Sequence, residues 1–391
     1  MFEDAGWYHL TATTLANGGG YLNPYAGHPT ASWPPGYPLV LALAYRVGGA
    51  VPATAVVLNA AFGALTCLFV WRLALRLAGE RAADVATALL VFFPSHVFFA
   101  ALVLSETLFT CLVVGLMLAA IRLVQDEDER GLVWLAWGVG AGLTALVRAE
   151  AAVLALVPPV ALASRGRGRA AVRVALAALA GLVVALAPWT VRNARLFGAF
   201  VPTSTGFGRT LWIGHNPDAF GGMSETIQRE MHEAIVAAGL PPTPAGELAT
   251  DRLLRGQAVA FLLDHPLREL ALTPARAYHL FRGDHVWQAW YGPGTPRVLP
   301  SAAARHALGI AGNAYYLIVG GLAVLGLVLR GRGAAAGWRV VDVWMLAWIA
   351  IFTAIYGDPR FHHLLVPPAC VLAAVALVRL GGGQRAAAAS A

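Results

Sequence analysis

Charged side chains stand at the ends of long apolar runs, where they could do chemistry at a membrane surface. Glu106 opens one such run. An ionisable residue at membrane depth is costly, so we treat it as a functional candidate. Arg148 and Glu150 interrupt another run, and the planar fork of an arginine can hold a phosphate through two hydrogen bonds. The sequence equally allows two structural roles: a helix-start role for Glu106, favoured by the helix dipole, and a local Arg148–Glu150 pair.

Two more arginines lie at the ends of apolar runs. Arg192 follows the exit of a run, and Arg360 lies in a tight turn shortly before His362 and His363. We expect Arg360 to face an anion, whereas Arg192 either adds a second phosphate contact or anchors a helix end. Adjacent histidines point to different faces of a helix, so they do not form a simple metal pair. The sequence therefore predicts no metal ligands and no certain cofactor, although a divalent metal remains an option.

The N-terminal segment combines an acid with aromatic rings. Asp4 precedes Trp7 and Tyr8, and Trp33 and Tyr37 flank a Pro-Pro-Gly turn. The rings could pack against a sugar or a lipid, and the Pro and Gly run predicts a rigid turn before the membrane. The alternative is an aromatic belt at the membrane interface beside a solvated acid.

The elements that must position these residues are membrane helices. The chain has 391 residues, of which 58% are hydrophobic and only 13% are charged, about half the usual charged fraction. A helix that crosses the hydrocarbon needs about 20 apolar residues. Runs near that length predict about nine spans, at 52–77, 82–101, 103–124, 131–148, 150–164, 171–190, 308–330, 338–356 and 364–380.

The basic residues indicate the orientation of these spans. All of them are arginines, and the net charge is +7. They crowd the short turns near 72–81, 165–173 and 330–339, so topology explains them better than a nucleic-acid partner does. By the positive-inside rule this face is cytoplasmic. The candidate residues then all lie on the extracytoplasmic face of a cell (inner) membrane.

The predicted fold is an all-α integral membrane bundle with an outer cap. Its parts are a first outer loop (1–50), helices (51–190), an extracytoplasmic cap (191–307), further helices (308–380) and a cytoplasmic tail (381–391). Within the cap, 206–217 reads as an irregular glycine-rich loop without a nucleotide fingerprint, and 246–264 and 266–281 read as amphipathic helices on the membrane surface. An outward N-terminal segment normally follows a preceding helix or signal, so we expect a first span to be missing from this sequence. The alternative is post-translational translocation of a short N-terminus.

The order of these motifs resembles that of a known group. It resembles the bacterial branch of the polytopic GT-C glycosyltransferases, akin to protein mannosyltransferases and aminoarabinose transferases (glycosyltransferase family 39-like). The resemblance covers nearly the whole chain and rests on Asp4 before Trp7-Tyr8, Trp33-Pro34-Pro35-Gly36-Tyr37-Pro38, Leu104-Ser105-Glu106-Thr107-Leu108, Leu146-Val147-Arg148, Pro188-Trp189-Thr190-Val191-Arg192-Asn193 and Leu211-Trp212-Ile213-Gly214-His215-Asn216-Pro217.

The resemblance implies transfer of a hexose or pentose from a polyprenyl-phosphate carrier on the outer side of the membrane. It implies Asp4 as the catalytic base, Glu106 as a second acid and Arg148 as the basic residue after the next pair of spans. This chain departs from the group in lacking the usual first span. It also has Ser32-Trp33 where aminoarabinose transferases carry an acidic-basic pair, which puts their donor and metal site in doubt.

These observations lead to a functional hypothesis. Asp4 and Glu106 would be catalytic, Arg148, Arg192 and Arg360 would contact the donor phosphate, and Trp7, Tyr8, Trp33, Tyr37 and His362 would contact substrate. The partners would be the lipid bilayer, a polyprenyl-phosphate sugar, and an acceptor lipid, glycan or protein of the cell envelope. The alternatives are a transporter or flippase, which usually places polar groups near the midplane, and a non-catalytic scaffold.

Overall fold

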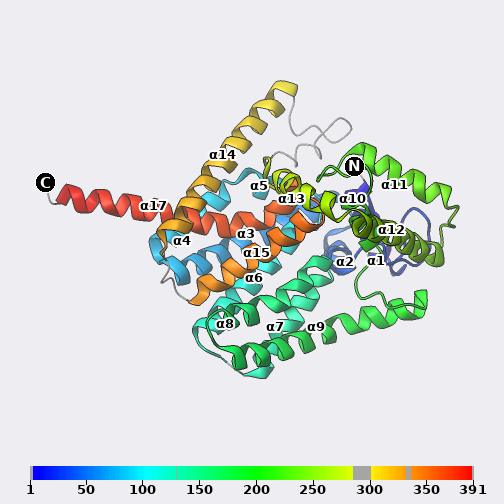
Figure 1. Ribbon diagram of the computed structural model, residues 1–391, viewed down its shortest axis with the longest axis horizontal. Helices are drawn as coiled ribbons and strands as arrows, with labels where there is room; N and C mark the ends of the chain where they lie inside the picture. The colour runs from blue at the N-terminus through cyan, green and yellow to red at the C-terminus, as the bar shows by residue number, and fades with distance from the viewer. Residues whose placement is uncertain (1–2, 129, 285–300, 332–335, 390–391) are drawn as a thin grey trace.

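The chain folds into helices, most of them joined by short turns, with a longer connection between α1 and α2 (Figure 1). The computed structural model describes residues 3–128, 130–284, 301–331 and 336–389, and within these ranges it contains no strand, only an isolated bridge between Leu22 and Pro29. The predicted all-α polytopic fold is confirmed. The helices outside the cap are α1 (Glu3–Ala16), α2 (Gly36–Gly48), α3 (Pro52–Ala78), α4 (Glu80–Val91), α5 (Pro94–Ala100), α6 (Glu106–Gln125), α7 (Gly131–Ala145), η1 (Ala149–Leu156), α8 (Val157–Ala163), α9 (Gly168–Phe197), α14 (Ala302–Leu329), α15 (Ala336–Ala354), α16 (Pro359–His362), η3 (His363–Leu365) and α17 (Val366–Ala389).

Six helices of the described residues are long and apolar enough to cross a membrane. They are α3, α6, α9, α14, α15 and the run from α16 into α17. The pair α4 and α5, which bends by 59° at its break, passes the same test as a pair and forms either a broken seventh span or a re-entrant loop. α7 and the η1–α8 pair are apolar but shorter. The nine predicted runs therefore all form helices, but the count of nine spans stays a prediction.

Close helix pairs in the bundle depend on glycine. A Cβ at Gly138 of α7 would collide with the backbone carbonyl of Ala178 on α9, and one at Gly326 of α14 would collide with the carbonyl of Leu372 on α17. Small residues let membrane helices approach until their backbones touch, which favours van der Waals packing where lipid provides no hydrophobic drive. These glycines therefore set the spacing of the α7–α9 and α14–α17 pairs.

Four helices form the described part of the cap: α10 (Phe207–Gly214), α11 (Glu225–Ala237), α12 (Pro244–Asp264) and α13 (Pro266–Phe281). α12 and α13 occupy the two predicted amphipathic patterns. A small apolar cluster, which includes Trp212, Ile227 and Leu254, packs α10 to α12 together with Tyr356. Residues 285–300 of the predicted cap lie outside the described residues.

The prediction of an irregular loop at 206–217 is wrong for its central part, which forms α10. Its glycines serve close packing instead of loop conformations. A Cβ at Gly208 would collide with the backbone carbonyl of Asp251, and one at Gly214 would collide with that of Ile355. Asp251 also accepts a hydrogen bond of 2.6 Å from the Gly208 N–H. The glycines therefore let α10 wedge between α12 and the end of α15.

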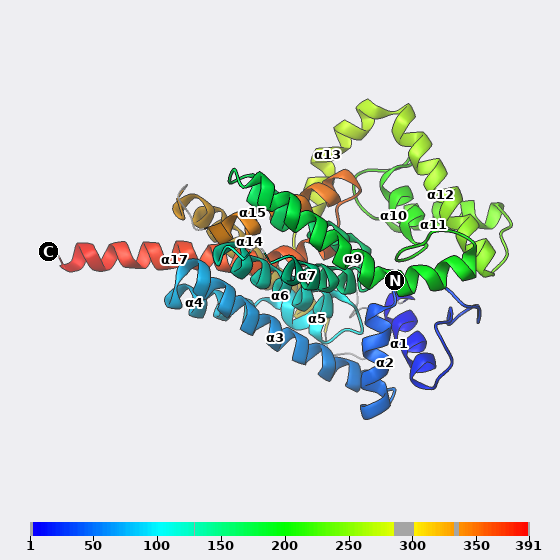
Figure 2. The same ribbon diagram turned by 90° about the horizontal axis from the view of Figure 1, so that it is seen from below.

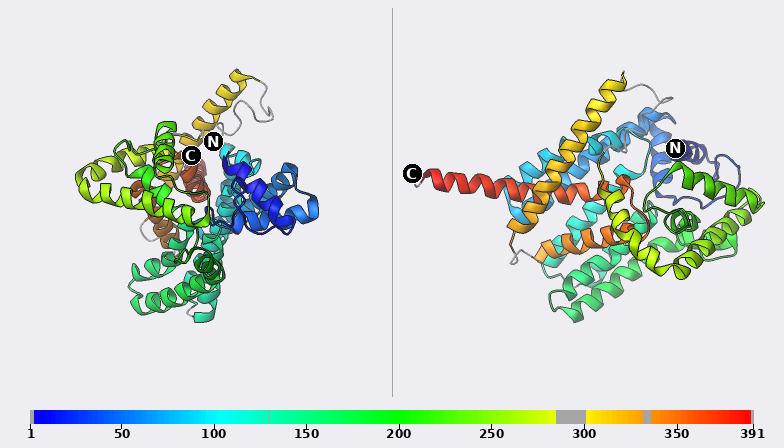
Figure 3. Two further views of the ribbon diagram at one scale, coloured as in Figure 1. Left: turned by 90° about the vertical axis from the view of Figure 1, so that its right-hand side faces the viewer. Right: turned by 45° about the horizontal axis from the view of Figure 1, so that its top comes forward.

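The two ends of the bundle differ (Figures 2 and 3). α1, α2 and the cap helices gather at one end, whereas the arginine-bearing turns after α3, α8 and α14 lie at the other. α17 continues through most of the predicted tail to Ala389 and projects from that second end. The turns after α7 and α15 lie at the cap end, because the Gly36 N–H of α2 donates to the Leu146 carbonyl at 2.7 Å and the Gly357 N–H donates to the Gly221 carbonyl of the cap at 2.9 Å.

Candidate functional site

Four separate segments each bring one charged residue to the cap end of the bundle. Asp4 lies in the first turn of α1, and Glu106 is the first residue of α6. Arg148 stands in extended conformation at the N-cap of η1, and Arg360 lies in the single turn of α16. Each residue thus sits at or beside the start of a helix at the cap end of the bundle.

The four side chains form one network of ion pairs. Arg360 donates from Nη1 to Asp4 Oδ2 at 2.9 Å and from Nε to Glu106 Oε1. Arg148 donates from Nη1 to Glu106 Oε1 at 3.0 Å and from Nε to Glu150 Oε1 at 2.7 Å. The structure therefore brings together the predicted acids and two of the three predicted arginines. The Arg148–Glu150 pair allowed by the sequence forms as part of the same network.

The network is largely removed from solvent. The Glu106 side chain is 4% exposed, and those of Arg148, Arg360 and Asp4 are 17–18% exposed. Glu106 Oε2 is buried and has no hydrogen-bond partner among the described residues. Three carboxylates, with Glu150, face two guanidinium groups, so the network carries a formal charge of −1. Because buried ion pairs depend on all their partners, removing one group should disturb the others.

Aromatic rings support the helix that carries Asp4. Tyr8 packs edge-to-face on Trp7 at 5.9 Å and on Tyr37 at 5.0 Å between ring centroids, and it lies 6.0 Å from Trp33. Its hydroxyl approaches Ser105 Oγ at 3.4 Å. Burial, and then the charge of Asp4, raises the pKa of Tyr8, so its phenol stays neutral. Trp7, Tyr8 and Tyr37 are buried and Trp33 is half-buried, so substrate contact by these four rings stays a prediction.

Arg192 lies outside this network of ion pairs. Its guanidinium lies 4.6 Å from the centroid of the Trp189 ring. It donates from Nη1 to the Thr30 carbonyl at 2.7 Å and from Nη2 to the Tyr21 carbonyl at 3.3 Å. Arg192 therefore holds the backbone of the first outer loop. In this arrangement the Arg192 guanidinium donates to backbone carbonyls, and its predicted contact with a phosphate stays a prediction.

His362 faces the cap rather than the ion pairs. Its Nδ1 lies 2.8 Å from the Leu280 carbonyl, its Nε2 lies 3.3 Å from Asp284 Oδ1, and its ring stacks on Tyr316 at 4.7 Å. The next residue, His363, points instead to Ser95. The two histidines thus diverge, and His362 joins the end of α13 to the segment that carries Arg360. Its predicted substrate contact stays a prediction.

Three residues that contact the predicted site residues or their segments were not predicted from the sequence as site residues. Asp358 caps α16 by accepting from the Arg360 N–H at 2.8 Å, and the Asp-Pro start of a helix was a readable signal for it. Glu150 belongs to the network although it was considered only as a structural partner of Arg148. Glu247 accepts from the first outer loop, and no sequence signal connects these two segments, which lie 216 residues apart.

The described side chains include the types of ligand group that hold metal ions in proteins. In the part of the chain that the structure describes, no three His, Cys, Asp or Glu side chains group closely enough to hold a metal ion. Asp4 and Glu106 both face Arg360, so the cation between these two carboxylates is a guanidinium.

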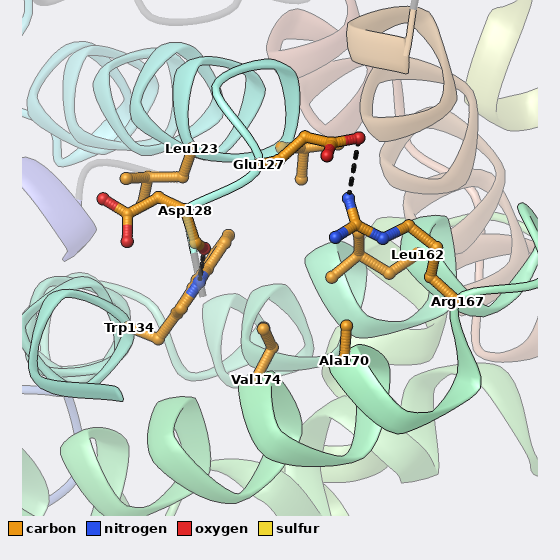
Figure 4. A pocket seen from close by; sticks show the side chains of 9 residues that line it. Leu123, Glu127, Asp128, Trp134, Leu162, Arg167, Ala170 and Val174 are labelled. Carbon is orange, nitrogen blue, oxygen red and sulfur yellow. Dashed lines mark hydrogen bonds and ion pairs between the residues drawn. The ribbon is translucent and has the colours of Figure 1, made fainter. Parts of the chain in front are cut away.

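A small hollow lies in the bundle away from this network (Figure 4). Leu123, Trp134 and Val174 line it, together with Arg167, which pairs with Glu127 at 3.2 Å. Its residues come from the arginine-bearing turns and the helix ends beside them, so it does not belong to the candidate site.

Residues 32–191 match the model of the family described as dolichyl-phosphate-mannose-protein mannosyltransferase. The fold resembles that of the archaeal oligosaccharyltransferase AglB from Archaeoglobus fulgidus, solved in complex with an inhibitory peptide and a dolichol-phosphate, with a TM-score of 0.58 and 14% identity over 99% of this chain and 47% of that chain. A complex of the Archaeoglobus fulgidus oligosaccharyltransferase with Zn and sulfate gives a TM-score of 0.57 and 13% identity over 98% and 45% of the two chains.

This chain thus spans about half the length of the oligosaccharyltransferases whose fold it shares. ArnT from Cupriavidus metallidurans, bound to undecaprenyl phosphate, is less similar, with a TM-score of 0.43 and 15% identity over 97% of this chain and 74% of that chain. Among the curated proteins, none matches the sequence. The family match for residues 32–191 and the fold of nearly the whole chain confirm its predicted resemblance to the polytopic GT-C glycosyltransferases.

Proposed function

We propose that this protein is a membrane glycosyltransferase that moves a sugar from a polyprenyl-phosphate-linked donor to an acceptor hydroxyl. The transfer takes place on the extracytoplasmic side of the cell membrane and inverts the anomeric centre. The single observation that carries this proposal is the ion-pair network, because it gathers two guanidinium groups and two candidate catalytic carboxylates at one end of the spans. A lipid-linked phosphate would lie at this depth while its chain remains in the bilayer.

The two arginines suit the leaving group. As the bond between the sugar and the phosphate oxygen breaks, negative charge grows on the phosphate, and preorganised cations stabilise such charge most in a site shielded from water. Arg148 and Arg360 are both mostly buried and already oriented by carboxylates. A guanidinium can hold two phosphate oxygens at once, so each arginine offers more than a point charge.

Arg360 also controls the proposed base. In the arrangement described here it donates to Asp4 and to Glu106 at the same time. A donor phosphate competes for the same guanidinium, so its arrival draws Arg360 from Asp4 and leaves that carboxylate able to accept a proton. Glu106 keeps Arg148 as a partner during this exchange and thereby orients the two arginines.

The transfer step then needs no further reagent. The acceptor oxygen attacks the anomeric carbon while the bond from that carbon to the phosphate oxygen breaks. The electron pair of the broken bond leaves with the polyprenyl phosphate, and the hydroxyl proton passes to Asp4. A single displacement of this kind inverts the anomeric configuration.

The placement of charge supports the proposed sidedness. The turns rich in arginine lie at the end of the bundle away from the cap, and positively charged loops are typically cytoplasmic. The ion-pair network and the cap would then face outward. The solved structure of AglB holds a dolichol-phosphate and a peptide, and by analogy we propose a polyprenyl-phosphate donor and a protein, glycan or lipid acceptor here.

Release of free polyprenyl phosphate tests the proposal. The protein, purified in lipid, is incubated with a panel of polyprenyl-phosphate hexoses and pentoses, with wild type beside Asp4→Asn. We expect one donor to be consumed by wild type and not by Asp4→Asn, although both fold and insert. Turnover retained in Asp4→Asn would remove Asp4 from the role of base, and silence of wild type with every donor would contradict the reaction class.

One observation favours a transporter or flippase as a second candidate. The α4–α5 pair is bent by 59°, and transporters often place their substrate sites at broken helices. Buried polar side chains lie near this break, where the ring of His96 in α5 stacks on that of His363 with 6.3 Å between the ring centroids. Solute or lipid flux in vesicles without any transfer product would favour this candidate over the glycosyltransferase.

A further inference from the structure

One peptide group of the first outer loop is held at both ends by charged side chains. The Thr30 carbonyl accepts from Arg192 Nη1 at 2.7 Å, and the Ala31 N–H donates to Glu247 Oε1 at 2.9 Å. These two groups belong to the same peptide bond. Hydrogen bonds to ionised partners are about twice as strong as neutral ones, so this peptide is fixed between a guanidinium on α9 and a carboxylate on α12.

Glu247 makes more contacts than this one. Its Oε2 accepts from the Thr30 hydroxyl at 2.6 Å, and its Oε1 also accepts from the Thr205 hydroxyl at 2.6 Å. The Thr205 N–H in turn donates to the Ala31 carbonyl at 2.9 Å. Thr30, Ala31 and Thr205 are buried. One carboxylate from the first turn of α12 thus joins the first outer loop to two parts of the cap, α12 itself and the segment before α10, at a site shielded from water.

The clamped loop leads directly to the helix that carries Asp4. The Thr30 N–H donates to the Tyr21 carbonyl at 3.3 Å, and the Tyr21 hydroxyl donates to the Trp33 carbonyl at 2.9 Å. The Tyr21 ring lies 5.8 Å from that of Trp7, which stands in α1 one turn after Asp4. A loosened loop would therefore loosen the packing that orients Asp4 toward Arg360.

We propose that Glu247 is a positioning residue for the transfer reaction, through which the cap holds the first outer loop and, with it, Asp4. This proposal rests on the glycosyltransferase function proposed above. Glu247 lies outside the ion-pair network and acts through the Thr30–Ala31 peptide. Its loss should lower kcat, because the base is misplaced, and should not weaken the affinity for the product polyprenyl phosphate, because Arg148 and Arg360 remain.

The hydrogen bonds predict a rescue by the isosteric amide. In Glu247→Gln the side-chain carbonyl can still accept from the Ala31 N–H and the Thr205 hydroxyl. The amide nitrogen can donate to Thr30 Oγ1, whose own proton can turn to Ser32 Oγ at 3.1 Å. Glu247→Ala loses all these bonds. Glu233→Ala is the matched control, because Glu233 lies on cap helix α11 with a side chain 67% exposed.

The experiment compares these three variants with wild type in lipid by turnover, by binding of polyprenyl phosphate and by hydrogen exchange of the segment 28–33. We expect Glu247→Ala to lower kcat by about tenfold or more, because it loses three charge-assisted hydrogen bonds, and to speed exchange at Ala31. Glu247→Gln should keep most of the wild-type turnover and protection, and Glu233→Ala should match wild type. Thr205→Val removes one bond and should show a smaller change in the same direction, even if Glu247→Ala fails to fold.

Three outcomes would overturn the proposal. They are unchanged exchange in Glu247→Ala, faster exchange with wild-type kcat, or a loss in Glu247→Gln as large as that in Glu247→Ala. If wild type itself releases no polyprenyl phosphate, the glycosyltransferase function fails instead, and the exchange measurement still tests the clamp by itself.

Discussion

Replacing Asp4 by Asn should strengthen the binding of free polyprenyl phosphate while it abolishes transfer. Asp4 holds Arg360 in the network, with 2.9 Å between Oδ2 and Nη1, so in our mechanism it competes with the phosphate for the guanidinium. Asparagine keeps the shape of the side chain and removes the competing charge. A variant that is catalytically dead would then bind the product better than wild type does.

The magnitude follows from the distance and the exposure of the pair. At 2.9 Å, Coulomb's law gives about 6 kcal/mol at an effective dielectric constant of about 20. Both side chains remain 18% exposed, and a released carboxylate regains hydration, so we expect a net effect of about 1–2 kcal/mol. A change of about 1.4 kcal/mol lowers Kd about tenfold.

Binding of polyprenyl phosphate to protein in lipid, followed by calorimetry or by a fluorescent analogue, measures this change. Asp126→Asn is the matched control: it removes the same charge, but Asp126 pairs with Arg76 and Arg122 near the arginine-bearing end of the bundle. We expect its Kd to equal that of wild type. An Asp4→Asn variant that binds the product as weakly as wild type, or more weakly, would refute the exchange of Arg360 between carboxylate and phosphate.

Three further predictions concern stability. Glu106→Gln should lower the free energy of unfolding by about 3 kcal/mol, because it leaves two largely buried guanidinium groups short of a carboxylate. Glu150→Gln, at the edge of the network, should lower it by less. Equal shifts in the melting temperature of the two variants would contradict this ranking. Burial lowers the pKa of His215 below its usual value, against the opposing charge of Glu269. The unfolded chain therefore binds the extra proton as the pH falls through about 6.5, and stability drops below that pH; the melting temperature measured from pH 8 to pH 5 should show this slope and lose part of it in His215→Gln. Gly214→Ala should destabilise by about 1–3 kcal/mol, because its Cβ would collide with the backbone at the end of α15, whereas Gly256→Ala on the open face of α12 should stabilise by up to about 1 kcal/mol; similar effects of the two alanines would argue against close packing at Gly214.

The sequence predicted the candidate cluster because charge is scarce in this chain. Asp4, Glu106, Arg148 and Arg360 stand out at the ends of apolar runs, and a helical bundle brings alternate ends of its spans to one face. Their pairing was beyond the sequence, because Asp4 and Arg360 lie 356 residues apart and many arrangements of spans satisfy the same pattern. Arg192 shows the limit: it stands at the same kind of position, yet binds backbone carbonyls of the first outer loop.

The cap was predicted less well because glycine occurs in two structural settings that look the same in a sequence. Glycine in 206–217 is typical of loops, but a glycine can also stand where a helix touches another backbone, as Gly208 does against Asp251. Only the tertiary contact distinguishes these cases. Glu247 was missed for a similar reason, because its local setting in the first turn of α12 is that of an ordinary helix start.

The ion-pair network also fixes an order of events during synthesis. Arg148 follows Glu106 by only 42 residues, whereas Arg360 follows it by 254. At about 5–20 residues per second, Glu106 would wait on the order of ten to fifty seconds for its second partner, with Arg148 as its partner in the meantime. Asp4 would wait longer still. The segment that supplies Arg360 thus acts as a late closing step, and a nascent chain that stops before it would leave Asp4 without Arg360 and Glu106 with Arg148 as its one arginine from the network.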